Sequence, residues 1–278
     1  MSSTKSPDEF LLKEDGAQIL RGVFSKEETQ NLKKLVSAIV EYADQGLEDP
    51  FERYYMGHIS DQGVLYDLFQ RHPEFQDFAK NPRILDALVP LLGEDIMLYV
   101  NSLIFKPKEI DNEVPWHQDF LNRPDEPPKV ICWIALDDAT KENGCLRVIP
   151  GSHTKGGYDW YRKEGSAHHD RIREGLIDES QKVYLEMQEG DVLLFSQFMV
   201  HGSDATKSDK HRRAFRIAYQ SLDKVFVSRG APIVLRGGGP EFLKKKFPKS
   251  KAKAKRSSYK TFLEKVGKRL IKMSYSDS

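Results

Sequence analysis

Two side chains able to bind a metal, His117 and Asp119, lie two positions apart near the middle of the chain. On an extended strand, residues i and i+2 project from the same face, so this imidazole and this carboxylate can chelate one ion. Two histidines and one carboxylate that leave coordination positions open suit non-haem Fe(II). A His-x-Asp triplet is common by chance. The interpretation therefore depends on a third ligand elsewhere in the chain.

His201 is the candidate third ligand. It follows a Gly-Asp turn at residues 189–191 and an apolar, buried-type strand predicted at residues 192–195. Gly202, next to it, permits close approach of a neighbouring backbone. His201 comes 84 positions after His117. Several predicted strands separate the two residues, and a rolled sheet would bring them together.

Arginines at the start of a predicted strand, Arg212, Arg213 and Arg216, are candidates for binding an anion. An arginine reaching into an otherwise apolar barrel is costly to bury unless it meets an anion, and its planar fork suits a carboxylate. Arg212 is the first choice. Strand alternation places Arg216 on the same face as Arg212, so the assignment among the three arginines stays open.

The elements that must position these residues change along the chain from helices to strands. Ser25 and Glu28 form a capping box before an amphipathic helix at 26–42. Further helices are predicted at 64–69, 73–79 and 82–92, and a polar insertion at 155–179. Strands are predicted at 96–105, 116–120, 130–136, 145–149, 183–187, 192–195 and 214–220. This order predicts an α+β fold, mainly antiparallel β, in which a barrel or sandwich carries its helices outside.

Composition predicts a reduced, intracellular protein. The chain has 278 residues, a net charge of +1 and two cysteines, too few for a disulfide framework. No apolar run approaches the roughly 20 residues that a membrane-spanning helix needs, and the N-terminus lacks a signal-peptide core. We expect a cytoplasmic protein.

The last 38 residues differ in charge from the rest. Residues 241–278 carry 13 Lys or Arg and 3 Asp or Glu, whereas residues 1–240 carry 30 basic and 39 acidic side chains. We expect one domain at 1–240 and a basic tail at 241–278 that contains an amphipathic helix. Residues 244–273 could bind an acidic membrane surface or a protein partner, or pack against the acidic body. No motif predicts specific nucleic-acid binding.

The order and spacing of these motifs resemble the phytanoyl-CoA dioxygenase family. The motifs are His117-x-Asp119, Gly144 with residues 148–153, Gly190-Asp191, His201-Gly202-Ser203 and Arg212. The resemblance implies an Fe(II)- and 2-oxoglutarate-dependent oxygenase on a double-stranded β-helix, a jelly-roll or cupin-like core. It also implies dioxygen as a cosubstrate and ascorbate as a stimulant.

Carried over by position, the resemblance gives roles to individual residues. The iron ligands would be His117, Asp119 and His201. Arg212 would bind the distal carboxylate of 2-oxoglutarate, with Ser203 and Gln118 assisting. Candidates for contact with the substrate are Trp116, Trp133, Tyr54, Arg171 and Arg173.

The implied reaction is hydroxylation of a C–H bond in a small or medium organic metabolite, with release of succinate and CO₂. Desaturation and other oxidative outcomes stay open, as do the identity of the substrate and the oligomeric state. Two alternatives remain. One is a catalytically silent barrel that acts through its basic tail as an interaction module. The other is a metal enzyme of the same shape that does not use 2-oxoglutarate.

Overall fold

The computed structural model describes residues 5–44, 64–107, 113–123, 126–164, 170–222 and 233–237. All of them belong to the first of two units, Met1–Gly237. The predicted basic tail at 241–278 and the candidate substrate residue Tyr54 lie outside the described residues. Their roles therefore stay predictions.

The N-terminal part of the chain is largely helical, as predicted. The capping box is confirmed, because Ser25 Oγ accepts from Glu28 N at 3.2 Å and Glu28 Oε2 accepts from Ser25 N at 2.7 Å. Asn81 caps a later helix by accepting from Arg83 N at 2.9 Å, and Gly93 ends it. The helices are η1 (Pro7–Glu9), α1 (Lys26–Asp44), α4 (Leu68–Arg71), α5 (Pro73–Ala79) and α6 (Pro82–Leu92).

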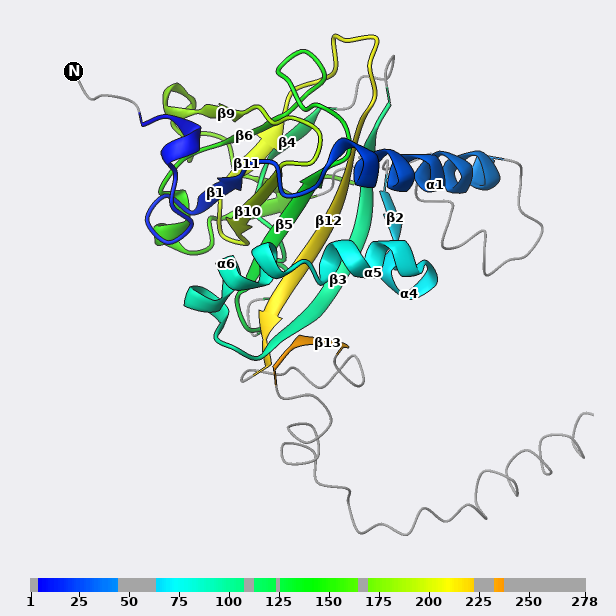
Figure 1. The fold of residues 1–278 in the computed structure, drawn as a ribbon. Coiled ribbons are helices and arrows are strands. Elements are labelled where there is room, and N and C mark those ends of the chain that lie inside the picture. The colour runs from blue at the N-terminus through cyan, green and yellow to red at the C-terminus, as the bar shows by residue number, and fades with distance from the viewer. Residues whose placement is uncertain are drawn as a thin grey trace, which may run out of the picture. The chain divides into compact units, whose positions relative to one another are not determined.

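The larger sheet supports the helices and has seven strands in the described part of the chain. Its order is β1-β10-β5-β12-β3-β13, with β2 also paired to β3, and all pairs are antiparallel (Figure 1). Its strands are β1 (Ala17–Leu20), β2 (Val64–Tyr66), β3 (Ile96–Lys106), β5 (Lys129–Ala135), β10 (Val192–Ser196), β12 (Arg212–Ser221) and β13 (Ile233–Arg236). The helix predicted at 64–69 is wrong in its first half, because the run that begins at Val64 pairs with β3 instead.

The smaller sheet has the order β4-β11-β6-β9. Its strands are β4 (Val114–His117), β6 (Leu146–Val148), β9 (Val183–Leu185) and β11 (His201–Ser203). The two sheets form a double-stranded β-helix, which confirms the predicted fold class. The strand predicted at 116–120 is wrong beyond His117. The chain turns there, and Phe120 adopts a left-handed conformation with φ 58°.

A short hairpin extends from the small sheet. Its strands are β7 (Trp160–Arg162) and β8 (Asp170–Ile172), and they pair only with each other among the described strands. The sequence predicted this stretch as a polar insertion without strands. The hairpin is anchored because Ile172 packs with Ile149, Val200 and Trp116. Two further turns are 3-10 helices, η2 (Ser152–Lys155) and η3 (Glu179–Gln181).

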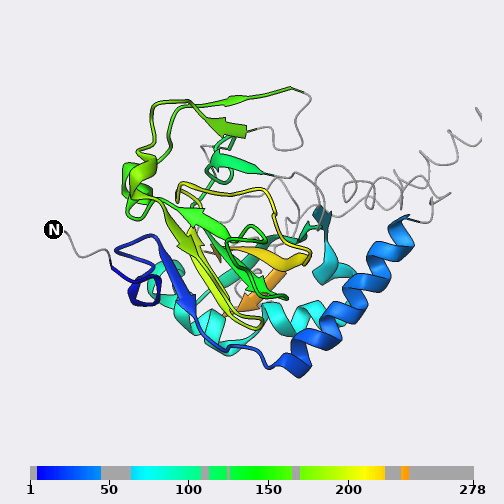
Figure 2. The same cartoon turned by 90° about the horizontal axis from the view of Figure 1, so that it is seen from above.

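The two faces of the large sheet bury different cores. On β12, Phe215, Ile217 and Tyr219 pack with the helices, which cover that face in Figure 2. Ala214 and Ala218 point the other way, into the space between the two sheets. This interior is filled mainly by apolar side chains of both sheets, among them Ile131, Trp133, Leu146, Val148, Leu185 and Leu193.

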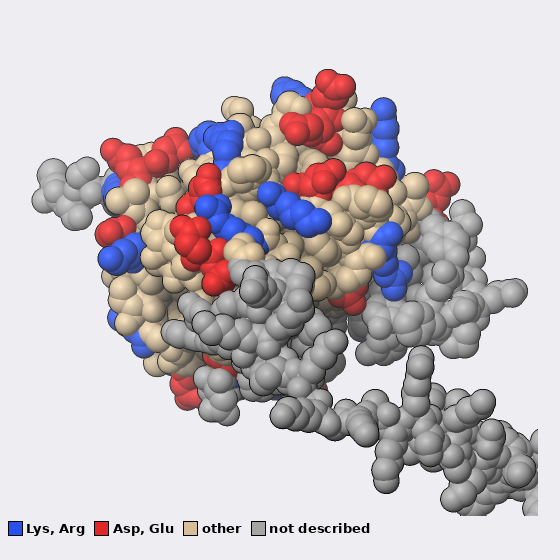
Figure 3. All heavy atoms as spheres, turned by 60° about the horizontal axis from the view of Figure 1, so that its bottom comes forward, with Lys and Arg blue, Asp and Glu red and all other residues tan. Residues whose placement is uncertain are grey.

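The surface of the described part carries both signs of charge. On the face drawn in Figure 3, acidic and basic side chains are interspersed rather than gathered into one broad patch. None of the described helices is both long enough and apolar enough to cross a bilayer.

Candidate functional site

The three predicted metal-binding side chains meet at one edge of the interior. His117 ends β4 and His201 begins β11, and the two residues are register partners in the small sheet. Their ring centroids are 4.1 Å apart. Asp119 lies in the turn after β4, where its N–H donates to Gln197 O at 3.0 Å. Ligand atoms from the three residues all lie within 4.8 Å of one another.

Both imidazoles are held with one ring nitrogen turned toward the backbone. His117 Nδ1 lies 2.9 Å from Pro115 O, and His201 Nδ1 lies 2.9 Å from Met199 O. A carbonyl oxygen only accepts, so Nδ1 carries the proton in both rings and Nε2 keeps its lone pair. Burial lowers the pKa of both rings, that of His117 to about 4. The rings are therefore neutral at pH 7, the state that binds a metal.

Asp119 supplies the negative charge of the cluster. Burial alone would raise the pKa of its carboxyl group, but Arg216 and the two imidazoles outweigh this and lower it to about 2. Arg216 Nη2 lies 2.7 Å from Asp119 Oδ1. The other oxygen, Oδ2, is buried without a hydrogen-bond partner and lies 3.9 Å from His201 Nε2. A buried carboxylate oxygen without a donor is costly, and a cation between Oδ2 and the two Nε2 atoms would satisfy it.

Two imidazoles and one carboxylate therefore fit Fe(II). The donor set is that of the two-histidine, one-carboxylate triad of non-haem iron sites. Each Nδ1 binds a backbone carbonyl, and Arg216 binds Asp119 Oδ1. Such partners orient metal ligands.

The three arginines of β12 have different environments. Arg212 is 3% exposed and points into the interior, with its guanidinium carbon 5.2 Å from the centre of the Trp133 ring. Arg216 points the same way, toward Asp119, which confirms the predicted shared face. Arg213 points to the helical side, where its fork binds both carboxylate oxygens of Asp137 at 2.7 and 2.8 Å. Only Arg212 keeps its guanidinium inside and clear of every carboxylate in the described part.

Of the two residues predicted to assist cosubstrate binding, Ser203 shares the interior with Arg212 and Gln118 does not. Ser203 Oγ accepts from the buried amine of Lys106 at 2.9 Å. Gln118 Nε2 donates to Gly156 O and Phe198 O, and its Oε1 accepts from Tyr158 N. The amide of Gln118 thus joins three backbone segments. Gly202 matches its prediction, because a methyl group there would lie 2.7 Å from Val114 O.

Among the predicted substrate residues that the structure describes, Trp133 packs in the interior core between the sheets. Trp116 neighbours His117 on β4 and so points to the opposite face, where the Arg147 guanidinium stacks on its ring at 4.5 Å. Arg173 is exposed and bound to Asp159 at 2.8 Å. Arg171 is on β8, next to the anchoring Ile172. The substrate roles of these residues stay predictions.

An aromatic and cationic wall beside Asp119 was not predicted. The Phe120 ring packs edge-on against Tyr99 at 5.3 Å, and Arg216 and Lys129 lie over Phe120 at 5.4 and 5.2 Å. Lys129 Nζ also lies 3.1 Å from Glu126 Oε2. The left-handed Phe120 places its ring here, and no local sequence signal announces that conformation.

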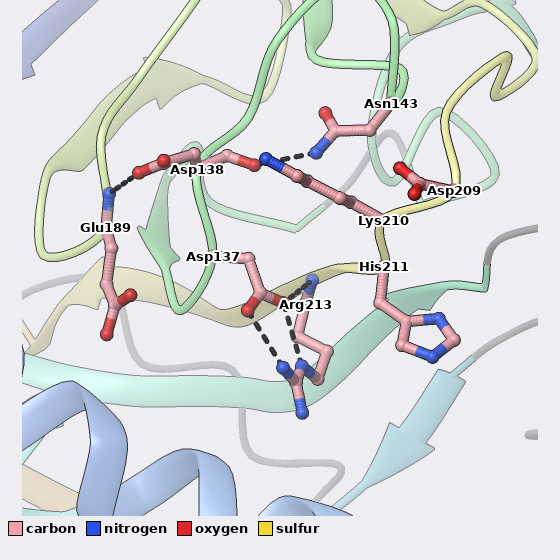
Figure 4. A pocket seen from close by; sticks show the side chains of 8 residues that line it. All are labelled: Asp137, Asp138, Asn143, Glu189, Asp209, Lys210, His211 and Arg213. Atoms are coloured by element: carbon pink, nitrogen blue, oxygen red, sulfur yellow. Dashed lines mark hydrogen bonds and ion pairs between the residues drawn. The ribbon is translucent and has the colours of Figure 1, made fainter.

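A hollow on the outer side of the barrel is separate from this cluster. It has a volume of about 310 Å³ and is lined by Asp137, Asp138, Asn143, Glu189, Asp209, Lys210, His211 and Arg213 (Figure 4). Arg213 and Lys33 bind its carboxylates of Asp137 and Glu189. It faces away from Arg212, so it is not the pocket of the metal-binding residues.

The family assignment comes from sequence. The family described as phytanoyl-CoA dioxygenase (PhyH) matches residues 12–214. The chain belongs to this family. A probable phytanoyl-CoA dioxygenase from Caenorhabditis elegans is 30% identical over 169 residues, 56% of this chain and 53% of that protein. The chain spans about half the length of the curated phytanoyl-CoA dioxygenases it matches.

Solved structures share the fold of this family member. EvdO2 from Micromonospora carbonacea var. aurantiaca, complexed with 2-oxoglutarate, matches with a TM-score of 0.61 and 20% identity over 86% of this chain and 96% of its own. EctD from S. alaskensis with bound Fe matches with a TM-score of 0.60 and 22% identity over 82% and 84%. At these identities the likeness shows the fold alone.

Proposed function

We propose that this protein is an Fe(II)- and 2-oxoglutarate-dependent dioxygenase that hydroxylates a C–H bond of a small or medium organic molecule. The observation that carries the proposal is the convergence of one ligand atom from each of His117, Asp119 and His201 within 4.8 Å, beside the buried and unpartnered Asp119 Oδ2. Membership of the phytanoyl-CoA dioxygenase family supports it, as does the iron or 2-oxoglutarate bound by two proteins of the same fold.

His117, Asp119 and His201 would hold the iron, each through an atom that the surroundings leave available. When bound, iron and 2-oxoglutarate supply the oxidation: one dioxygen converts 2-oxoglutarate to succinate and CO₂ and the substrate C–H to C–OH. Arg216 holds Asp119 Oδ1, and we infer that this fixes the carboxylate so that only Oδ2 faces the metal. The low pKa of Asp119 keeps it anionic at every pH at which the protein would work.

Arg212 would bind the distal carboxylate of 2-oxoglutarate, with Ser203 beside it. Its guanidinium lies over Trp133 in a water-poor interior, where a charge-assisted hydrogen bond is strong. The aromatic wall of Phe120 and Tyr99 lies on the Asp119 side of the cluster and is our candidate for the substrate side. Its rings would exclude water from the reacting atoms.

The test begins with metal-free protein under anaerobic conditions. Fe(II) and then 2-oxoglutarate are added, and the visible charge-transfer band of the chelate is recorded. The band should appear and then decay with formation of succinate when air is admitted. His117→Ala should bind no iron, and Arg212→Ala should bind iron but need far more 2-oxoglutarate.

Arg213→Ala is the matched control, because Arg213 is the neighbour of Arg212 but points to the helical side. It should leave the 2-oxoglutarate titration unchanged. If iron binds but the wild type forms no chelate band, the cosubstrate assignment is wrong. If iron does not bind at all, the barrel is a scaffold and the interaction-module alternative replaces the enzyme. Once the band is established, its decay rate in air is the readout for screening substrates.

A further inference from the structure

Two buried cations, Lys106 and Arg212, lie directly opposite each other on β3 and β12. They are 2% and 3% exposed, and register partners on an antiparallel pair share a face. Like charges placed opposite each other destabilise a sheet, and a buried cation is tolerated when an anion pairs with it. Within the described part of the chain neither residue forms an ion pair. In this part of the chain the two cations therefore lie together without an anion bound to either of them.

The hydrogen bonds of both cations go to neutral acceptors. Lys106 Nζ donates to Ser203 Oγ at 2.9 Å and to the carbonyl of Asp204. Arg212 Nη1 donates to Gly144 O at 2.7 Å, and its buried Nε has no hydrogen-bond partner. An ammonium has three donors and a guanidinium five, so both retain donors for a ligand.

Gly144 brings the two cations to the same place. Its carbonyl binds Arg212, and a methyl group on its α-carbon would lie 2.8 Å from Lys106 Nζ. Gly144 also has φ +77°, a conformation that favours glycine. The amine and the guanidinium thus both lie against one residue, beside the Ser203 hydroxyl. This grouping offers the positive charge and the hydrogen-bond donors that a carboxylate binds.

We propose that Lys106 is a second cationic ligand of the cosubstrate's distal carboxylate, acting together with Arg212 and Ser203. This inference rests on the proposed function and extends it. One carboxylate placed between the two cations would remove their repulsion and satisfy the unpartnered Arg212 Nε. We therefore expect the protein to take up one proton from solvent onto Lys106 Nζ when the dicarboxylate binds.

The proton uptake follows from the environment of Lys106. Burial, and then the nearby charge of Arg212, lower the pKa of Lys106 from 10.5 to about 7. A carboxylate at contact distance would raise it again, because an adjacent anion favours the charged amine. At pH 8 the free protein would hold a mostly neutral amine and the complex an ammonium, so 2-oxoglutarate should bind less tightly as pH rises above 7.

Other titratable and charged groups around Lys106 come from several elements. Arg212 is on β12, Arg147 on β6, and Asp204 and Glu113 follow β11 and precede β4. Beyond them, Cys145 lies near Arg212 and Tyr184 binds Asp204. Burial raises the pKa of Cys145 to about 12, and burial lowers that of Arg212 only to about 10. A change in affinity for 2-oxoglutarate between pH 7 and 9 that is absent once Lys106 is replaced is therefore assigned to Lys106.

The experiment compares two ligands on two proteins. 2-Oxoglutarate and 2-oxopentanoate, which lacks the distal carboxylate, are titrated anaerobically into the Fe(II) forms of wild type and Lys106→Met. The band gives each Kd at pH 7 and pH 9. We expect Lys106→Met to raise the Kd for 2-oxoglutarate by about 10- to 100-fold at pH 7, the range for loss of a hydrogen bond to a charged group. Its Kd for 2-oxopentanoate should be unchanged.

The pH series and a second variant complete the test. For the wild type, the Kd of 2-oxoglutarate should rise by about tenfold per pH unit above pH 7, and for Lys106→Met it should be flat. Lys106→Arg keeps a charge and should retain discrimination between the two acids without the pH dependence. If Lys106→Met weakens the binding of both acids equally, the ratio of their affinities is unchanged. Lys106 then only supports the fold, and the inference is overturned. Absence of the band in the wild type would instead overturn the proposed function itself.

Discussion

Replacing Lys106 with Met should stabilise the ligand-free protein, although it removes two hydrogen bonds. Burial beside Arg212 lowers the pKa of Lys106 from 10.5 to about 7. An amine in the unfolded chain keeps the higher value, so between pH 7 and 10.5 the unfolded state binds more protons and the folded state is penalised. One pKa unit corresponds to about 1.4 kcal/mol, so the penalty at pH 7 is about 5 kcal/mol.

The net gain is smaller, because the variant leaves acceptors without their donor. Ser203 Oγ and the carbonyl of Asp204 lose the Lys106 amine, at a cost of about 1–3 kcal/mol. Met occupies a similar volume, so we expect a rise of roughly 2–3 kcal/mol in the free energy of unfolding at pH 7. Urea denaturation of metal-free protein measures it. At pH 9 the penalty in the wild type has fallen to about 2 kcal/mol, so the advantage of Lys106→Met should shrink or vanish.

Lys129→Met is the matched control, and we expect it to lower the free energy of unfolding where Lys106→Met raises it. Lys129 is buried to the same extent, but its Nζ lies 3.1 Å from Glu126 and over the Tyr99 ring at 4.3 Å. Removing it takes away the nearer of two cations at the buried Glu126 carboxylate and leaves Arg123 at 3.9 Å, which should destabilise the protein by about 3 kcal/mol. If both variants lower stability alike, or if the effect of Lys106→Met is independent of pH, then Lys106 is a paired structural ammonium and the reasoning is refuted.

Three further outcomes are expected. Arg216→Met releases Asp119 Oδ1 and should weaken iron binding about 10- to 100-fold in an anaerobic competition with a chelator; unchanged affinity would remove its positioning role. Gly144→Ala forces a methyl group to 2.8 Å from Lys106 Nζ at a left-handed φ. It should lower the free energy of unfolding, measured with urea, by about 1–3 kcal/mol and raise the Kd for 2-oxoglutarate. Wild-type values of both quantities would show that Gly144 is not needed beside Lys106. The pKa of His117, lowered to about 4, means that metal-free protein should lose up to about 3 kcal/mol of stability as pH falls from 6.5 to 4, a loss that His117→Asn should reduce.

The three candidate metal ligands meet as the sequence predicted, although the expected strand geometry was partly wrong. His117 and Asp119 were expected to share one strand face. The strand ends at His117, and Asp119 lies in the turn that follows, where its N–H donates to Gln197 O and its Oδ2 lies 3.9 Å from His201 Nε2. The ligand types and their spacing carried the prediction. The turn could not be predicted, because a phenylalanine gives no local signal for a positive φ.

The arginines show that strand alternation predicts the face on which a side chain lies but not the partner that it binds. Period-2 alternation correctly placed Arg212 and Arg216 on one face of β12. It could not give the partners of Arg216 and Arg213, because Asp119 and Asp137 come from distant parts of the chain. Lys106 was missed for the same reason. A lysine before a proline at the end of an apolar strand indicates a solvent-exposed end, and only its pairing with Arg212 shows that it is buried.

The hairpin of β7 and β8 was hidden by its composition. Each strand has only three residues and mixes apolar with charged side chains, so neither apolar alternation nor an apolar run marks the strands. Ile172 anchors it by packing with Ile149, Val200 and Trp116. An anchor made of one side chain against residues far along the chain carries no periodic pattern.

The candidate site takes its parts from two different sheets. All three metal-binding residues lie on the small sheet or the turn after β4, whereas Arg212 and Lys106 belong to the large sheet. A dicarboxylate that contacts both groups is therefore a crosslink between the sheets. Such a crosslink should slow the separation of the two layers, so that amide hydrogen exchange in β11 and β12 becomes slower together when the cosubstrate binds. Bound 2-oxoglutarate would thus stabilise the contact between the two sheets of the barrel as well as act as a reactant.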